Sequence, residues 1–142
     1  MFSDLSTELL QSGYSVRFRP PGHSMHPTIR DGETVVVEPV SALSVRRGDI
    51  LLCRTQCGLT AHRVVAVRKN ERARVFILRG DASRSCDEPV EAEQVLGRVI
   101  QVERDERVID LASMRARLRQ TARLRAARLR SALLPASRTE SI

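Results

Sequence analysis

A serine, a histidine and an aspartate, far apart along the chain, are the residues whose types could together do covalent chemistry. Ser24 lies in the segment P-G-H-S-M-H-P, His62 lies in A-H-R-V-V, and Asp81 ends the segment R-G-D. A serine hydroxyl becomes an effective nucleophile when a base removes its proton, and a neutral histidine, with an ordinary pKa of about 6.5, can do this at neutral pH. A carboxylate bonded to the other ring nitrogen holds the ring in place. The three residue types therefore predict nucleophilic catalysis, provided that the fold brings them together.

Short segments of alternating or β-branched residues, separated by turn residues, predict a mainly β fold around these three residues. The β-branched run at 34–38 follows the turn sequence R-D-G-E, and the apolar run at 50–54 follows R-R-G-D. We expect strands at residues 15–19, 34–38, 50–54, 59–68, 74–79 and 94–103, with a bulge at Gly97 in the last of them.

The expected strands give a route by which the candidate residues meet. Residues 59–68 and 74–79 are joined by a short turn, so His62 in the first strand and Asp81 after the second are expected on neighbouring strands. The strand at 15–19 ends at two prolines and leads the chain to Ser24. Residues 82–93 lack periodicity and predict a surface loop, and residues 4–11 predict a short helix.

The end of the chain has a different pattern, in which apolar residues recur every three or four positions among arginines. This pattern predicts a basic amphipathic helix at 109–134, followed by a disordered tail at 135–142. Residues 1–14 form an N-terminal segment in this scheme, and residues 15–108 form the β domain. All of the net charge of +7 lies in residues 111–142, which hold eight arginines and one glutamate, because residues 1–110 hold 16 basic and 16 acidic side chains.

The sequence leaves three alternatives for the partner of this helix. It could pack on its own β core or on a second copy of the chain, as amphipathic helices commonly do. It could also lie on an anionic membrane surface through residues 111–134. Nucleic acid is the third partner and is not favoured, because neither a helix-turn-helix pattern nor stacking aromatic residues accompany the charge. The oligomeric state is left open.

Length and composition restrict the number of domains, the location of the protein and the cofactors it could bind. The 142 residues fit one domain, and no apolar run approaches the roughly 20 residues that cross a bilayer. Three cysteines and no signal-peptide pattern favour reduced thiols and a cytoplasmic location. Thiolate and imidazole ligands suit zinc, so Cys53, Cys57, Cys86 and the histidines are possible ligands. No second closely spaced pair accompanies Cys53 and Cys57, so we expect neither a metal nor a nucleotide cofactor.

The order of the motifs resembles that of the signal peptidase I clan of serine proteases, which also includes the autocleaving SOS repressors. The motifs are G-x-S-M-x-P-T-I, G-D-I-L, H-R-V, G-D-A, a C-D-E-P loop and V-L-G-R-V, and together they span about residues 16–102. The resemblance implies the antiparallel β fold of that clan, with Ser24 as the nucleophile. His62 stands where the archaeal and endoplasmic-reticulum type has histidine and the bacterial leader peptidases have lysine. Asp81 corresponds to the aspartate of the G-D motif and Asp87 to a second downstream acid.

The resemblance also implies a class of substrate, and this sequence departs from the pattern of the clan at two points. Substrates would be peptides or leader segments cut after small residues and bound as an extended strand. Those enzymes often have a serine two positions before the nucleophile, where this chain has Gly22, so backbone N–H groups near Ser24 and Met25 are expected to support the oxyanion. The transmembrane anchor of signal peptidases has no counterpart here.

We therefore expect a serine endopeptidase with Ser24, His62 and Asp81 as its catalytic residues. One alternative is a catalytically inactive module that binds a partner through its groove or its arginine-rich helix. A second alternative is an autocleaving regulator, which is disfavoured because no Ala-Gly pair stands upstream of Ser24 as a bond to cut.

Overall fold

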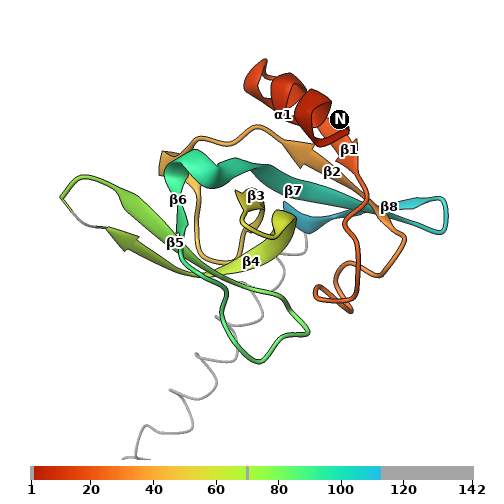
Figure 1. Cartoon of the computed structure of the whole chain (residues 1–142). Coiled ribbons are helices and arrows are strands. Elements are labelled where there is room, and N and C mark those ends of the chain that lie inside the picture. The colour runs from red at the N-terminus through yellow and green to blue at the C-terminus, as the bar shows by residue number, and fades with distance from the viewer. Residues whose placement is uncertain (1, 70, 113–142) are drawn as a thin grey trace, which may run out of the picture. The chain divides into compact units, whose positions relative to one another are not determined.

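The computed structural model describes residues 2–69 and 71–112, and the described chain up to Leu111 forms one compact unit (Figure 1). One helix, two short 3-10 turns and eight strands make up this unit, and every strand pair is antiparallel. The prediction of a mainly β fold is therefore confirmed. In chain order, the elements are α1 (Phe2–Gln11), β1 (Val16–Phe18), β2 (Thr34–Glu38), η1 (Ala42–Ser44), β3 (Ile50–Thr55), β4 (Gly58–Lys69), β5 (Arg74–Arg79), β6 (Val90–Glu91), η2 (Ala92–Gln94), β7 (Val95–Arg104) and β8 (Arg107–Asp110).

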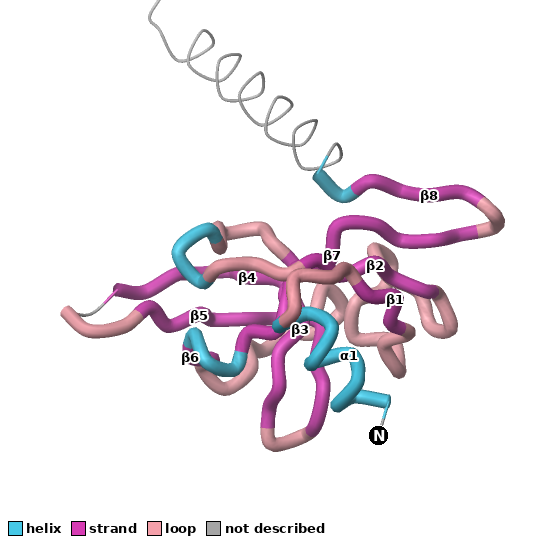
Figure 2. Tube along the Cα trace, turned by 90° about the horizontal axis from the view of Figure 1, so that it is seen from above, coloured by secondary structure: helices cyan, strands magenta, loops and turns pink. Residues whose placement is uncertain are grey.

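The strands form one sheet in the order β1-β2-β7-β3-β4-β5-β6, and β8 pairs with β7. Strand β7 joins the two halves of the sheet, because it pairs with β2 along one edge and with β3 and β8 along the other. Figure 2 shows the long strands β4 and β5 running side by side away from β2 and β7. Helix α1 packs on β1 and β7.

Strand β3 lies between two hydrophobic cores. Ile50 and Leu52 belong to the first core, which includes Val35 of β2, and Leu51 belongs to the second, which includes Phe76 of β5. Because successive side chains of a strand point to opposite faces, a strand covered on both faces needs apolar residues without alternation. This requirement accounts for the continuous run I-L-L-C at 50–53, in which every residue is buried.

Strand β4 changes its partner halfway along its length. Residues Gly58–Arg63 pair with β3, and residues Arg63–Lys69 pair with β5. The edge of Gly58–His62 that faces away from β3 is therefore unpaired with any strand in the described part of the chain. The pairing with β5 shifts register between Val64 and Ala66, which interrupts the regular alternation expected along this strand.

Several boundaries differ from the sequence predictions. The strands predicted at 34–38 and 74–79 have those bounds, whereas the predicted loop at 82–93 contains β6 and the start of η2. Strand β8 crosses the predicted boundary between residues 108 and 109 and continues to Asp110, and the compact unit extends to Leu111. Residues 111 and 112 are helical, and the rest of the helix predicted at 109–134 and the tail at 135–142 lie outside the described residues. Within the ranges described, no helix combines the length and apolar character needed to cross a membrane.

Gly97 provides a test of the contact between β2 and β7. The register of β7 against β3 shifts beside this residue, as the predicted bulge requires, and a Cβ at Gly97 would lie 2.5 Å from the Glu38 carbonyl oxygen and 2.6 Å from Val37 Cγ1. Replacing Gly97 by Ala should therefore overpack this contact and lower the free energy of unfolding by about 1–3 kcal/mol. Urea unfolding followed by circular dichroism measures the effect, and a midpoint equal to that of the parent protein would contradict the packing described.

Candidate active site

The segment that carries Ser24 is a compact turn between β1 and β2. Two backbone hydrogen bonds close it, from His26 N–H to the His23 carbonyl at 3.1 Å and from Ile29 N–H to the Met25 carbonyl at 3.0 Å. The side chains of Met25 and Ile29 are buried in the first core. Because the neighbouring residues are anchored in this way, half-buried Ser24 is held against the unpaired edge of β4.

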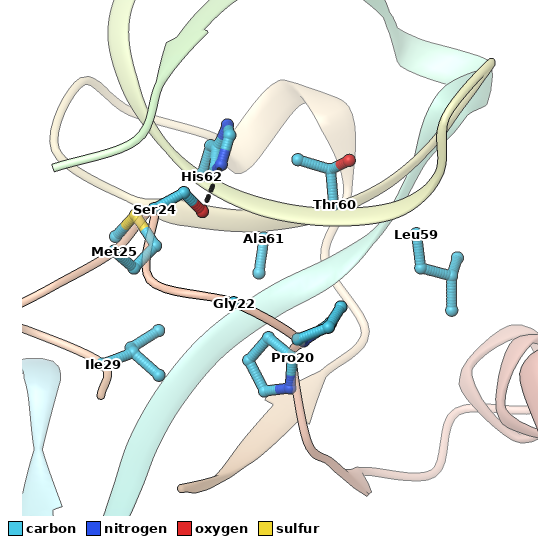
Figure 3. A pocket seen from close by; sticks show the side chains of 10 residues that line it. Pro20, Gly22, Ser24, Met25, Ile29, Leu59, Thr60, Ala61 and His62 are labelled. Carbon is cyan, nitrogen blue, oxygen red and sulfur yellow. Dashed lines mark hydrogen bonds between the residues drawn. The ribbon is translucent and has the colours of Figure 1, made fainter. Parts of the chain in front are cut away.

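Ser24 and His62 meet at that edge. Figure 3 shows the hydrogen bond between them, which spans 2.9 Å from Ser24 Oγ to His62 Nε2. The other ring nitrogen, Nδ1, is bonded to Asp87 Oδ2. A carboxylate only accepts hydrogen bonds, so in the neutral ring Nδ1 carries the proton and Nε2 accepts from the Ser24 hydroxyl. The His62 side chain is only 12% exposed, which restricts its movement away from this geometry.

Asp81, which the sequence suggested as the partner of His62, lies elsewhere, and this part of the prediction is wrong. Its carboxylate accepts hydrogen bonds from Nε and Nη2 of Arg63, both at 2.8 Å, and from Thr28 Oγ1 at 2.5 Å. Strand pleating explains the difference, because adjacent residues of β4 point to opposite faces. Arg63 pairs with Arg79 of β5, so Asp81, two residues further on, follows the face of Arg63 rather than that of His62.

Asp87, which the resemblance gave only as a supporting acid, occupies the position on His62. It reaches the ring from the loop between β5 and β6, where its N–H donates to the Leu78 carbonyl at 2.9 Å. The sequence around it offers one signal, the C-D-E-P motif, but no periodicity that would place it in space.

Asp81 instead ties the β5–β6 loop to the turn of Ser24. Its N–H donates to Met25 Sδ at 3.4 Å, and the next residue, Ala82, donates its N–H to the Ser24 carbonyl at 2.9 Å.

Burial opposes ionisation of Asp81, but the hydrogen bonds from Arg63 and Thr28 outweigh it and hold the pKa of the carboxyl below its ordinary value. The Arg63 guanidinium also donates to the Gly48 carbonyl at 3.0 Å. This network fixes the nucleophile turn from one side.

An arginine of β7 fixes the same turn from the other side. Arg104 Nη2 donates to the Thr28 carbonyl at 3.2 Å, while its Nε donates to Glu33 Oε2 at 2.5 Å. The hydrogen bond from Arg104 holds the pKa of Glu33 below its ordinary value. Sequence reasoning missed Arg63, Thr28 and Arg104 as positioning residues, because the pairing of distant residues leaves no local pattern.

Gly80, the glycine of the G-D-A motif, is a further residue of the site, and no role was predicted for it. A Cβ on it would lie 2.6 Å from the Ser24 carbonyl oxygen and 3.2 Å from His62 Nε2. The first contact is shorter than packed atoms tolerate, and the oxygen belongs to the backbone of an anchored turn. Glycine is therefore required here by space, since only a hydrogen lets the β5–β6 loop approach both catalytic candidates.

A pocket of about 230 Å³ opens beside the Ser24–His62 pair. Figure 3 shows Ala61, Leu59 and Pro20 to one side of the pair. No residue with a permanent charge lines the pocket, and most of its wall is apolar. Its lining consists of Pro20, Pro21, Gly22, Ser24, Met25, Ile29, Leu59, Thr60, Ala61 and His62.

Gly22 lies at this pocket with a φ of +83°, a region that residues with side chains rarely adopt. A serine at this position would be strained in the present backbone conformation. The Ser24 N–H remains as a backbone donor, since it donates to no acceptor within residues 2–69 and 71–112.

The cysteines and histidines that could bind zinc do not form a cluster in the described part of the chain. Cys53 is buried, and burial first, then the nearby charge of Asp87, raises the pKa of its thiol to about 12. Cys57 and Cys86 are exposed. His23 and His26 are exposed as well, and His23 Nε2 lies 3.9 Å from Asp31. Over the described ranges, no three histidine, cysteine or acidic side chains are grouped as a metal site would require.

Comparisons with known proteins gave no match, whether against family models, curated proteins or solved structures.

The ion pair of Asp81 gives a prediction for stability. In Asp81→Asn the hydrogen bonds to Arg63 lose their charge assistance, so the free energy of unfolding at pH 7 should fall by about 1.5–3 kcal/mol. Because the folded-state pKa of Asp81 is depressed, its contribution is fully present above the ordinary aspartate pKa of about 4 and is lost as the pH falls below it. The difference between parent and variant should thus be constant from pH 7 to 5 and shrink towards pH 3.

Urea unfolding at each pH measures this difference. Asp31→Asn is the matched control, because Asp31 is exposed and lies 3.9 Å from a single partner, and its effect should stay within about 0.5 kcal/mol. An Asp81→Asn variant as stable as this control at pH 7 would contradict the network.

Gly80 gives a second prediction. In Gly80→Ala the added methyl must displace the Ser24 carbonyl or the β5–β6 loop, so the variant should lose about 1–3 kcal/mol of unfolding free energy. The Ser24 amide signal should also shift in an amide NMR spectrum, because Ser24 lies at the contact. An unchanged unfolding midpoint together with an unshifted Ser24 signal would show that the loop does not approach the turn this closely.

Proposed function

We propose that the protein is a serine endopeptidase in which Ser24 is the nucleophile, His62 the general base and Asp87 the group that orients His62. The observation that carries the proposal is the hydrogen bond of 2.9 Å from Ser24 Oγ to His62 Nε2, made by a ring whose Nδ1 is bonded to Asp87. A nucleophile, a base and an orienting group in this mutual contact are the elements of covalent acyl transfer.

The chemistry follows from the tautomer that Asp87 selects. His62 Nε2 takes the hydroxyl proton as Ser24 Oγ bonds to the carbonyl carbon of a peptide, and Asp87 stabilises the imidazolium that forms. The tetrahedral intermediate collapses when the C–N bond breaks and His62 gives its proton to the departing amine. Water then attacks the ester, and His62 serves again as base, so that the acid product leaves and Ser24 regains its proton.

The oxyanion of the intermediate needs donors that are in place beforehand. In this proposal the Ser24 N–H supplies one of them, because it has no other acceptor in the described chain and belongs to an anchored turn. The positive φ of Gly22 would strain a serine at this position, so in this proposal backbone donors carry the task.

The substrate would lie along the unpaired edge of β4. A peptide chain can add to an exposed strand edge through backbone hydrogen bonds, and its alternate side chains then point to one side. The apolar pocket next to Ala61 and Leu59 would receive such side chains on the acyl side of the cut. The order of motifs, which is similar to that of the signal peptidase I clan, supports the same fold type and small residues before the scissile bond.

The proposal is tested with a fluorophosphonate probe and with peptides that place small residues before the scissile bond. Ser24→Ala should abolish labelling, and Ser24→Ala and His62→Ala should each lower kcat/KM by about 10³-fold or more. Asp87→Asn should lower it by about 10²–10⁴-fold, because the ring loses its orienting group. Asp81→Asn should retain more activity than Asp87→Asn, since Asp81 does not contact His62.

Asp31→Asn is the control and should leave kcat/KM unchanged. Cleavage that persists in Ser24→Ala would end the proposal. A protein that binds such peptides with no labelling or cleavage would instead be the inactive binding module, for which the same pocket and edge would serve.

A further inference from the structure

Ser83 belongs to a tight turn that is attached directly to the nucleophile. The Ser83 N–H donates to the Gly80 carbonyl at 2.9 Å, which closes the turn, and the Ala82 N–H between them donates to the Ser24 carbonyl at 2.9 Å. A change in this turn is therefore transmitted to the backbone of Ser24.

The hydroxyl of Ser83 lies close to the working nitrogen of His62. A Cβ placed on Gly80 would be 3.0 Å from Ser83 Oγ and 3.2 Å from His62 Nε2. The two atoms are thus separated by about 6 Å or less, across a gap that exists because residue 80 is glycine. A single water molecule can bridge polar atoms at such a separation.

Ser83 has no other evident task. It is half-buried, and its hydroxyl bonds to no protein group in the described part of the chain. Because no side chain in that part of the chain occupies it, the Ser83 hydroxyl is available to hold a water molecule.

The turn that contains Ser83 is not part of the wall of the pocket. The pocket that would hold the acyl part of the substrate is lined by residues 20–22, 24, 25, 29 and 59–62, and the 80–83 turn contributes nothing to it although it approaches both Ser24 and His62. Figure 3 shows Leu59 and Pro20 on one side of the pair. The turn therefore borders the leaving-group side, which the amine vacates before hydrolysis.

We propose that Ser83 is the positioning residue for the hydrolytic water, an inference that depends on the proposed serine peptidase chemistry. The water donates one hydrogen to His62 Nε2 and the other to Ser83 Oγ, which leaves a lone pair directed at the ester carbon. As the new C–O bond forms, His62 takes the proton. When the bond from carbon to Ser24 Oγ breaks, His62 returns that proton to Ser24, and the carboxylic acid product leaves.

The test separates acylation from deacylation. Burst kinetics with a p-nitrophenyl ester of N-acetylalanine give the acylation rate from the burst and the deacylation rate from the steady state. Ser83→Ala should slow deacylation by about tenfold or more, while acylation changes by less than about twofold, because only the second step uses the water. Acyl-enzyme should then accumulate as a species of increased intact mass.

Two further variants keep the result interpretable. Ser83→Thr keeps a hydroxyl and should restore deacylation, which a loss of folding would not allow. Ser85→Ala, at an exposed serine of the same loop, should leave both rates unchanged. Equal deacylation in Ser83→Ala and the parent, or equal losses in both steps, would overturn the role of Ser83. Failure of the parent protein itself to acylate at Ser24 would overturn the proposed function, and the role of Ser83 with it.

Discussion

The exchange of pairing partners along β4 is the constraint on which the site depends. Its first half pairs with β3 and its second half with β5, and Arg63 is the residue at which both pairings meet. If β5 continued beside Gly58–His62, the backbone edge would be filled and Ser24 could not approach His62. The nucleophile turn and the β5–β6 loop both use the space that this early divergence of β5 leaves open.

Two adjacent residues at the exchange point, His62 and Arg63, each contact an aspartate of the same loop. His62 contacts Asp87, and Arg63 contacts Asp81 on the other side of the strand. The two carboxylates thus have different surroundings and different tasks. Asp81 is held ionised by a guanidinium and binds the loop to the nucleophile turn, whereas Asp87 selects the tautomer of an imidazole.

Much of the scaffold could be predicted from local pattern, because burial leaves a periodic signal. The β-branched run of β2 and the fully apolar run of β3 are direct consequences of faces covered by a core. Strand β8 gave no such signal. Its turn uses Asp105 and Glu106 at positive φ, where glycine or asparagine would have marked a hairpin, and most of its side chains are exposed.

The site was predictable in part. The contact of Ser24 with His62 was expected, but the prediction of Asp81 as the third residue rested on the hairpin that joins the two strands and on the G-D motif, and neither gives the direction of its side chain. Arg63 and Arg79 are paired, and alternate residues share a face, so Asp81 lies on the face opposite to His62. This placement requires the register of β4 and β5, which the sequence does not specify. The position of Asp87 depends on a loop whose path is set by contacts with Leu78, Ser24 and Met25, none of which a local pattern records.

The protonation state of His62 tests the central claim most directly, because it reports the Asp87 contact without any substrate. Nitrogen-15 NMR of the imidazole at a pH where it is neutral should show the Nδ1–H tautomer, with a strongly deshielded Nδ1 proton that disappears in Asp87→Asn and persists in Asp81→Asn. An Nε2–H tautomer, or a spectrum that Asp87→Asn leaves unchanged, would contradict the arrangement of Ser24, His62 and Asp87.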